Sequence, residues 1–502
     1  MFFFAALLAC ASHADPDEPK AEKTGKKGKK KHGAESALVE WPAVPADLRA
    51  ADEALISGEL AKVKTAAAAR PVPQVGGAAA GNVLVVVLDT VRADHLGMYG
   101  YDRGTTPNLD RWAAGAHIWD NAETDAPWTL PAHASMFTGK TQREHAARSL
   151  GKDDDRKAAP LAASYVTIAE RLQAAGYRTV GVAGNRAFLH PSFGVAQGFD
   201  AWIDEQPQDD SRKVPYTPAD RIVPMALSAV AQADEHPLFL FVNLMDAHTP
   251  YKARVGYVKE PDKLKRASIP GNKGFRKVAE KLLSGGGPVD PAIAASWSEA
   301  YDAELRFEDE QLAKLLEATA SYAHVFVLAD HGEFLGEHGL VEHAKDVYEP
   351  VTHVPFLAKD ARFPPGHDPA LIQSHDLAWM VLGAAGLDDG GAIHTDGLAV
   401  TELTYTLKKD LDASYGKRFD RIRRAYRIGP QKLILGTDGT SELYDLTKDP
   451  GELHAILGLP DLFEGVAEKW LAAHPEAPVV SAAESGPLGP DEEALKALGY
   501  AE

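Results

Sequence analysis

The stretch TDAPWTLPAHASMFTG, from Thr124 to Gly139, places a hydroxyl, that of Thr129, at the expected start of a short helix. The first amides of a helix have no partner inside it, so a helix with a threonine at its N-cap offers free N–H groups and a positive dipole end to an anion. Pro131 suits this first turn because it has no amide hydrogen to lose. We therefore predict that Thr129 is a nucleophile; the alternative is that it only caps the helix.

Acidic and imidazole side chains stand at the ends of three apolar runs that we predict as strands. Each run ends in residue types that bind metals: Asp89, Asp246 with His248, and Asp330 with His331. Ligands of open α/β sheets lie beyond the carboxyl ends of the strands, so we expect these side chains to meet at one edge. A divalent cation bound there would hold an anionic ester and lower the pKa of a neighbouring hydroxyl. Taken singly, an aspartate at such a place is more often a helix cap or a turn residue.

The strand-like runs alternate with segments of helical periodicity. Central parallel strands are buried on both faces and are therefore rich in branched apolar residues. The strand-like segments are 82–89, 177–184, 236–246, 324–331 and 353–359, and the helical ones include TTPNLDRWAAG, TIAERLQAAG, PADRIVPMALSAVAQAD and EAYDAELRFEDEQLAKLLEAT. This alternation predicts an α/β fold, in which residues 81–392 form a mainly parallel sheet sandwiched by helices.

Beyond residue 392 the pattern changes to short antiparallel signals. The segment RIRRAYRIGPQKLILGTDGTSELYDLT contains two strand-like runs joined by a Gly-Thr-Asp-Gly turn. Such a turn between apolar runs is typical of a hairpin. We predict that residues 393–502 form a small C-terminal α+β subdomain packed on the first.

The composition restricts the partners of the chain. Its 502 residues are 45% hydrophobic, which allows one large domain with a smaller appendage. The formal net charge is -19, and such an acidic chain lacks the basic surface that nucleic acid requires. We predict an anionic ester as the substrate and no nucleic-acid partner, and the composition leaves the oligomeric state open.

The N-terminus reads MFFFAALLACASHADPDEPK, a short apolar run that ends at Cys10, the single cysteine of the sequence. Residues 1–10 resemble a bacterial lipobox, which implies cleavage before Cys10 and lipidation of its thiol; an ordinary signal peptide is the alternative. Either way we expect export to the cell envelope, with a lipid anchor as the only membrane attachment. Residues 11–80, rich in Lys, Ala, Pro and Gly, are expected to be a disordered tether, in which the alanine-rich segment DLRAADEALISGELAKVKTAAAA could form a helix.

Several blocks of the sequence are similar, in order, to those of the sulfatase family of the alkaline phosphatase superfamily. They are VLVVVLDTVRADHLGMYGY, DAPWTLPAHASMFTG, MDAHTPY, LADHGEFLGEHG, VYEPVTHVPF and KLILGTDGTSELYDLTKDPGELHAIL. The resemblance spans about residues 82 to 457 and implies the fold of that superfamily. It also implies a metal held by Asp89, Asp330 and His331 together with the nucleophile, and it places Thr129 at the nucleophile position.

The resemblance also implies roles for two histidines. His248, in a His-x-Pro-Tyr block, would contact the transferred group or protonate the leaving oxygen. His343, five residues before Tyr348, stands where related sequences carry a His or Lys that faces the same pocket. Lys345 would neutralise substrate charge or be solvated, and Glu333 would lie behind the metal ligands or in a loop.

The chain departs from true sulfatases at the nucleophile. Those enzymes convert the first residue of Cys/Ser-x-Pro-x-Arg to formylglycine, whereas this chain reads TLPAH from Thr129 to His133. A threonine cannot become that aldehyde hydrate; His133 replaces the arginine, and Thr90 replaces the second acid of the usual Asp-Asp pair. Thr90, His133 and Asp246 would then support the ligands or the substrate. The reduced number of carboxylates favours zinc or manganese, with calcium, which prefers about six to eight oxygen ligands, as the alternative.

These residues predict an exported, metal-dependent hydrolase or transferase that cleaves phosphate-type esters, mono- or diesters, through a threonine nucleophile. Thr129 would attack phosphorus, the helix N-terminus and the metal would stabilise the developing charge, and His248 or His343 would protonate the leaving oxygen. Two alternatives are a sulfuric ester hydrolase that works without formylglycine and a non-catalytic lipoprotein that binds anionic glycans. The joint presence of metal-type ligands, a hydroxyl and two histidines weighs against the second.

Overall fold

The computed structural model describes residues 39–75, 78–152, 154, 158–204, 215–232, 234–264, 270, 273–387, 397–458, 460–481 and 484. Cys10 and the first part of the expected tether lie outside these residues, so lipidation and export stay predictions. Among the helices described, none combines the length and the apolar character needed to cross a membrane.

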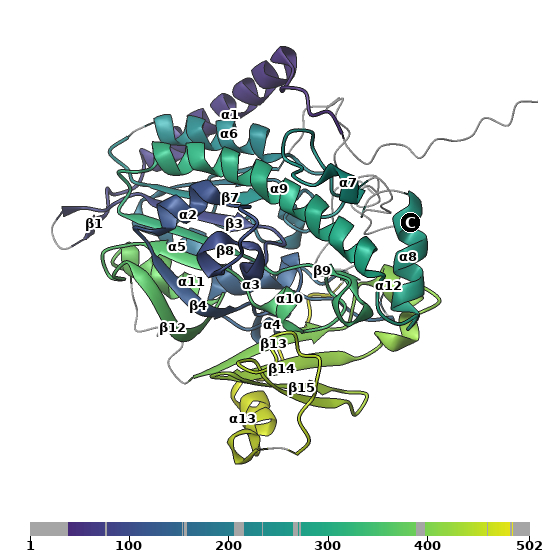
Figure 1. Cartoon of the computed structure of the whole chain (residues 1–502). Helices are drawn as coiled ribbons and strands as arrows, with labels where there is room; N and C mark the ends of the chain where they lie inside the picture. The colour runs from purple at the N-terminus through teal and green to yellow at the C-terminus, as the bar shows by residue number, and fades with distance from the viewer. Residues whose placement is uncertain are drawn as a thin grey trace, which may run out of the picture. The chain divides into compact units, whose positions relative to one another are not determined.

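An eight-stranded sheet forms the centre of the large domain (Figure 1). Its strands follow the order β12, β4, β11, β8, β3, β7, β5, β6. Their bounds are β3 Val83–Leu88, β4 His117–Glu123, β5 Arg178–Ala183, β6 Ala201–Ile203, β7 Leu238–Leu244, β8 His324–Ala329, β11 Phe356–Lys359 and β12 Gly366–Gln373. Strand β11 is antiparallel to both of its neighbours, and the other described strands of this sheet run in one direction. The predicted mainly parallel sheet is therefore confirmed.

The middle strands are built from long apolar runs. Every residue of β3 and β7 is buried, and so is β8 after its first residue, His324. Strand β3 pairs in parallel with β7 on one side and β8 on the other, so that Leu88 lies beside both Leu244 and Ala329. Because these parallel strands end in register, the residues that follow them emerge together at one edge of the sheet.

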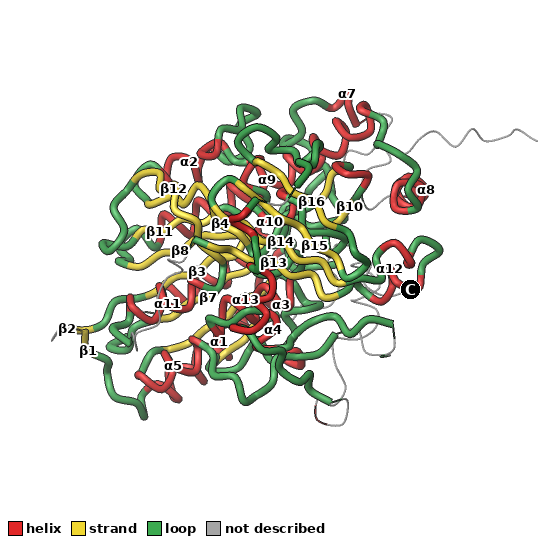
Figure 2. Tube along the Cα trace, turned by 90° about the horizontal axis from the view of Figure 1, so that it is seen from below, coloured by secondary structure: helices red, strands yellow, loops and turns green. Residues whose placement is uncertain are grey.

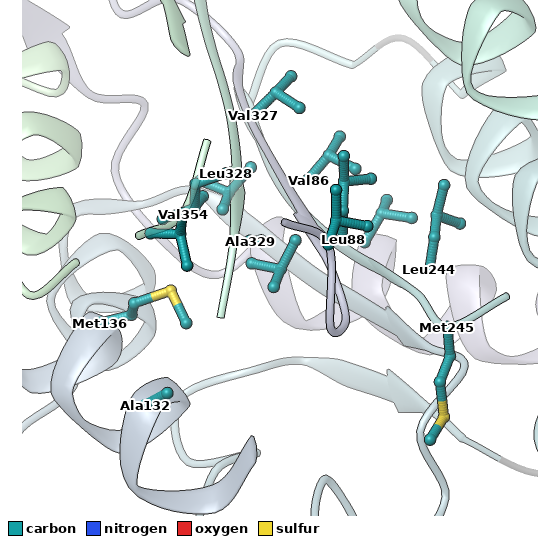
Figure 3. Packing of buried hydrophobic residues seen from close by; sticks show 14 of the residues in the cluster. Val86, Leu88, Ala132, Met136, Leu244, Met245, Val327, Leu328, Ala329 and Val354 are labelled. Atoms are coloured by element: carbon teal, nitrogen blue, oxygen red, sulfur yellow. The ribbon is translucent and has the colours of Figure 1, made fainter. Parts of the chain in front are cut away.

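Two groups of helices cover this sheet, and the helices of each group contact one another. One group comprises α1 Ala46–Ala67, α2 Pro107–Ala113, α6 Ala219–Ala231 and α9 Pro291–Ala318, and the other comprises α3 Thr129–Thr138, α5 Ile168–Ala175 and α11 Asp376–Ala384. Ala132 and Met136 of α3 belong to the same buried cluster as Leu88 and Ala329 of the sheet (Figure 3). The four helical segments named from the sequence coincide with α2, α5, α6 and α9.

The helix allowed for the alanine-rich segment is present as α1, but the expectation that this part of residues 11–80 belongs to a disordered tether is wrong. This helix has one buried apolar face: Leu48, Ile56, Leu60 and Val63. On the same face, Asp52 accepts two hydrogen bonds from Arg221 of α6, at 2.6 and 2.8 Å. The high alanine content of α1 hides this apolar stripe in the sequence, although the spacing is that of a packed amphipathic helix.

A four-stranded antiparallel sheet forms the C-terminal subdomain (Figure 2). It consists, in spatial order, of β13 Leu398–Thr404, β14 Ile422–Ile428, β15 Gln431–Gly436 and β16 Ser441–Asp445, and α13 Val466–Ala473 packs on it. The predicted antiparallel subdomain is confirmed, but the segment from 421 to 447 holds three strands rather than two. Gly429, with a φ of 55°, and Pro430 form an additional turn between β14 and β15. The predicted boundary between residues 392 and 393 lies outside the described residues.

Shorter elements complete the described chain. They are α4 Gln142–His145, α7 Pro261–Leu264, α8 Lys273–Leu283, α10 Glu349–Thr352, α12 Lys408–Asp412, and the two-stranded pairs β1 Gln74–Val75 with β2 Ala78–Ala79 and β9 Phe334–Leu335 with β10 Val341–Glu342. Two of them matter for the site described below, because β10 leads directly into His343 and α12 carries Lys409 and Asp410.

Candidate active site

Helix α3 presents Thr129 in its first turn. The N-cap residue is Trp128, in extended conformation, so the prediction that Thr129 is the N-cap is wrong by one position and Thr129 is the first helical residue. Its side chain is buried, with 1% exposed, and its hydroxyl oxygen accepts a hydrogen bond from Asn185 Nδ2 at 3.3 Å. A residue from another element therefore positions this hydroxyl, which does not cap its own helix.

Three side chains at the carboxyl edge of the sheet bring their ligand atoms together. They are Asp89, after β3, and Asp330 and His331, after β8, and one ligand atom of each lies within 4.8 Å of the other two. His331 Nε2 is 3.4 Å from Asp330 Oδ2 and 4.0 Å from Asp89 Oδ1. These three atoms are buried and have no hydrogen-bond partner. Buried polar atoms without partners are costly, so the arrangement fits a cation that all three would bind.

The second polar atom of each ligand is held by the protein. Asp330 Oδ1 accepts hydrogen bonds from the amides of Thr90 and His331, at 3.1 and 2.9 Å. His331 Nδ1 lies 2.9 Å from the Gly332 carbonyl and donates to it, which leaves the Nε2 lone pair directed toward the two carboxylates. Contacts of this kind fix the tautomer and the orientation of metal ligands. The chain thus provides a preformed set of one imidazole and two carboxylates.

Asn185 links the hydroxyl to this set, and the sequence did not reveal it. Its Nδ2 donates to Asp89 Oδ2 at 2.9 Å as well as to Thr129 Oγ1. Its Oδ1 accepts from the amides of Ala187 and Phe188, at 3.0 and 3.2 Å, so the side chain amide is fixed at both ends. Asparagine is common in turns, so the residue type alone does not indicate a functional role. Its place directly beyond a predicted parallel strand, β5, is the signal that could have found it.

Burial shifts the pKa values of the three ligands toward their neutral forms. It raises the pKa of Asp89 to about 7, and it raises the pKa of Asp330 well above the ordinary value, with the charge of Asp89 adding to the effect. Burial also lowers the pKa of His331 well below the ordinary value, so its imidazole is neutral and keeps the lone pair that a metal requires. A bound cation would favour the ionised form of both carboxylates.

The two histidines named from the sequence lie together beside this set. The ring centre of His343 is 4.6 Å from that of His331 and 4.9 Å from that of His248. His343 Nδ1 lies 3.1 Å from Glu333 Oε1, so Glu333 is a buried support and not a solvated loop residue. His248 Nδ1 lies 2.5 Å from the carbonyl of Thr249. Each imidazole is therefore held through Nδ1 next to the candidate metal site.

A small cavity of about 10 Å³ adjoins the two histidines, and its lining also includes Glu342, Lys345 and Lys409. Lys345 is 1% exposed and pairs with Asp410 at 2.7 Å, so the expectation of a solvated lysine is wrong. Burial lowers the pKa of Lys345, but the neighbouring carboxylates, Asp410 first and Glu342 second, together raise it by more, and the lysine stays charged. Because Asp410 and Lys409 belong to α12, residues beyond the large domain also reach this cavity.

Asp246 lies behind the site and does not join the metal-type ligands. One of its carboxylate oxygens accepts a hydrogen bond from Arg254 Nη2 at 2.6 Å, and the other accepts from the Ala219 amide at 2.8 Å. Its own amide donates to Glu308 Oε2 at 3.0 Å. The buried guanidinium attracts the carboxylate away from the edge where Asp89 lies, which leaves Asp246 as a support for the loop after β7.

Thr90 and His133, which stand in place of an acid and an arginine of the sulfatase pattern, lie next to the ligands and Thr129. Thr90 Oγ1 donates to the Asp89 carbonyl at 2.6 Å, with the Thr90 backbone at a φ of 61°. His133 Nδ1 lies 2.9 Å from the Thr129 carbonyl and 3.6 Å from Asp330 Oδ2. Both side chains therefore support residues of the site.

Comparison with known proteins agrees with this geometry. A family model for sulfatases matches residues 81–387. The Uncharacterized sulfatase YidJ of Escherichia coli (strain K12) is 23% identical over 435 residues, which cover 75% of this chain and 83% of that protein. In fold, the chain is similar to a 2-O GAG sulfatase, with a TM-score of 0.60, 16% identity and coverage of 82% of this chain and 97% of that one. It is also similar to the phosphonate monoester hydrolase of Agrobacterium radiobacter, with a TM-score of 0.59, 17% identity and coverage of 82% and 99%. The chain therefore belongs to the sulfatase family, has the fold of the alkaline phosphatase superfamily, and is an ester hydrolase.

Proposed function

We propose that this chain cleaves phosphate-type mono- or diesters through Thr129 with the help of a divalent metal, and releases the group to water or to an acceptor alcohol. One observation carries the proposal: Asn185 Nδ2 contacts both Thr129 Oγ1 and Asp89 Oδ2, at 3.3 and 2.9 Å. One side-chain amide thereby links the hydroxyl to the metal-type ligand Asp89, at the position where the family carries its nucleophile.

The metal site rests on the donor set of this chain. Members of the superfamily generally use a divalent metal, and Asp89 Oδ1, Asp330 Oδ2 and His331 Nε2 would hold it next to Thr129. Two carboxylates with one imidazole favour zinc or manganese over calcium. When bound, the metal would act as a Lewis acid on the ester and lower the pKa of the Thr129 hydroxyl.

The residues of the chain supply the remaining chemistry. Thr129 Oγ1 gives its proton to His248 or His343 and forms a bond to phosphorus, while the bond from phosphorus to the leaving oxygen breaks. The same histidine then gives this proton to the leaving oxygen. Burial lowers the pKa of both rings, that of His248 to about 4, so the ring is neutral before it takes the proton and releases the proton readily afterwards. Water or an acceptor alcohol then attacks the phosphothreonine, loses its proton to the same histidine, and restores Thr129. The amides at the start of α3 stabilise the charge that develops on the transferred group.

The threonine favours phosphate over sulfate. A formylglycine hydrate carries a second hydroxyl that can expel the bound group, and Thr129 carries none. The intermediate must therefore be released by attack on its central atom, which phosphoryl groups support through in-line displacement. Membership of the sulfatase family keeps sulfuric esters as the second candidate, and the similarity to a phosphonate monoester hydrolase makes aryl phosphonates worth testing.

A metal analysis of the purified protein combined with a substrate screen tests this function. The screen compares 4-nitrophenyl phosphate, bis(4-nitrophenyl) phosphate, 4-nitrophenyl phenylphosphonate and 4-nitrophenyl sulfate. We expect one zinc or manganese per chain and the fastest turnover on a phosphate-type ester. Turnover on the sulfate alone would instead support a sulfatase that works without formylglycine, and turnover on none of the four would contradict the proposal.

Variants of Thr129 test the nucleophile, with Thr138→Ala as a control from the other end of the same helix. We expect Thr129→Ala to fold and bind metal but to lose turnover by a factor on the order of 10⁴, as for other covalent catalysts, and Thr129→Ser to retain part of it. Thr138 Oγ1 only donates to the Ala134 carbonyl, at 2.7 Å, so Thr138→Ala should retain turnover. Intact-mass analysis of the wild type should show a phosphoryl adduct on the peptide that contains Thr129. A Thr129→Ala rate within about tenfold of wild type would leave water as the attacking group.

A further inference from the structure

The residues that precede the family-matched part of the chain contact the loop that carries His248. Val39 forms a parallel bridge with Arg254, eight residues after Asp246. Its amide donates to the Ala253 carbonyl at 3.3 Å, and its carbonyl accepts from the Val255 amide at 2.9 Å. The first described residues of the chain are thus joined to the end of the loop that starts after β7.

Trp41 extends this contact by covering Arg254. The Arg254 guanidinium lies between two aromatic rings, 4.1 Å from the ring centre of Trp41 and 3.9 Å from that of Phe307. Trp41 itself is fixed by a hydrogen bond from its Nε1 to Asp220 Oδ2 at 3.1 Å. A guanidinium stacked on aromatic faces is attracted by their quadrupoles and screened from water.

Arg254 closes the loop by binding residues at its start and on α9. It pairs with Asp246 at 2.6 Å and with Glu304, and none of these three side chains is exposed. Glu304 Oε1 also accepts from the amides of Lys252 and Ala253, at 2.7 and 2.8 Å. Both ends of the segment from 246 to 254 are therefore tied to one buried charge cluster, and His248 lies between them.

We propose that Trp41 is a positioning residue for His248. Residues 39–44 then contribute to the geometry of the candidate active site, although they precede the region that the sulfatase family shares. The exclusion of water by Trp41 keeps the Arg254–Asp246 pair intact, because a buried ion pair loses much of its strength when one face is hydrated. The pair closes the loop, and the closed loop holds the imidazole beside His343. The inference rests on the proposed function only for the role of His248 in turnover.

Amide hydrogen exchange tests the positioning without any substrate. We expect Trp41→Ala to speed exchange of the amides in 246–255 by about tenfold or more, while the amides of β3 and β8 keep their protection. Trp41→Phe, which retains an aromatic face over Arg254, should restore most of the protection. Trp112→Ala is the matched control, because Trp112 is also a half-buried tryptophan packed on the core, but it lies on α2.

Turnover on the ester found in the substrate screen supplies the second measurement. Trp41→Ala should lower kcat by about tenfold with KM within about twofold and with unchanged metal content, whereas Trp112→Ala should leave kcat unchanged. Unchanged exchange in 246–255, or equal losses in Trp41→Phe and Trp41→Ala, would overturn the inference. If the wild type cleaves none of the esters, the proposed function fails, but the exchange result still decides whether Trp41 orders the loop.

Discussion

Replacing His375 with glutamine should remove a pH-dependent part of the stability of this protein. His375 immediately precedes α11 and is buried, and its Nδ1 lies 2.6 Å from Asp125 Oδ1. The amide of His375 and the hydroxyl of Ser374 donate to Asp125 Oδ2, at 2.9 and 2.8 Å. Burial alone would lower the pKa of His375, but the Asp125 carboxylate outweighs it and raises the pKa from 6.5 to about 9.

The direction of this shift sets the sign of the effect. A histidine with a higher pKa in the folded chain binds its proton more tightly there, so its stabilisation is fully present below pH 6.5 and is lost as the pH rises through about 9. Each pKa unit corresponds to ~1.4 kcal/mol, so the free energy of unfolding of the wild type should fall by about 3 kcal/mol more than that of His375→Gln over this range.

Urea unfolding at a series of pH values between 6.5 and 9 measures this difference. Subtracting the two curves matters because other groups titrate in the same range, among them Glu333, whose pKa burial raises to about 8. His454→Gln, at an exposed position, is the control and should follow the wild type. Parallel curves for the wild type and His375→Gln would refute the reasoning and would mean that the Asp125 contact is equally strong with a neutral ring.

Three further predictions follow from the other parts of the structure. Asp330→Asn should lower metal content and thermal stability together, because a metal that binds only the native state stabilises it; unchanged metal stoichiometry would remove the site. Asp52→Ala should lower the free energy of unfolding in urea by about 3 kcal/mol, because it removes the carboxylate that pairs with buried Arg221. An unchanged free energy of unfolding would mean that α1 does not contribute to the stability of the domain. Cys10→Ser should move the protein from the membrane to the soluble exported fraction, because each buried methylene of an acyl chain contributes about 0.8 kcal/mol. Membrane association that survives in a fractionation assay would point instead to the lysines of residues 11–80 as the attachment.

The central sheet, and the edge at which the candidate ligands lie, can be predicted from the sequence. Runs of buried apolar residues mark β3, β7 and β8, and parallel strands must end together. Three of the ligand-type residues after those runs, Asp89, Asp330 and His331, meet as expected. The order of the sulfatase-like blocks predicts Thr129 as the hydroxyl of the site.

The sequence does not predict which polar residues at that edge face the candidate site, because this depends on contacts made in the folded chain. Asp246 follows a buried strand just as Asp89 does, yet Arg254 binds its carboxylate and turns it away. Asn185 has an unremarkable type in the sequence but contacts both Thr129 and Asp89. A strand pattern sets where a side chain leaves the sheet, whereas its direction depends on partners that lie far away in the sequence.

The N-terminal region is a second case in which the sequence did not predict a tertiary contact. Its lysine- and alanine-rich composition predicted a tether, but residues 39–67 pack on α6 and on the loop after β7. The stability of α1 comes from a stripe of a few apolar residues and one carboxylate. These match a surface made by α6, β5 and β6, which follow much later in the chain, as the 169-residue separation of Asp52 and Arg221 illustrates. The amino-acid composition of the segment does not reveal such a stripe, because its few apolar residues are outnumbered by alanines and lysines. A helix face becomes buried only when a complementary surface packs against it, and that surface exists only in the folded chain.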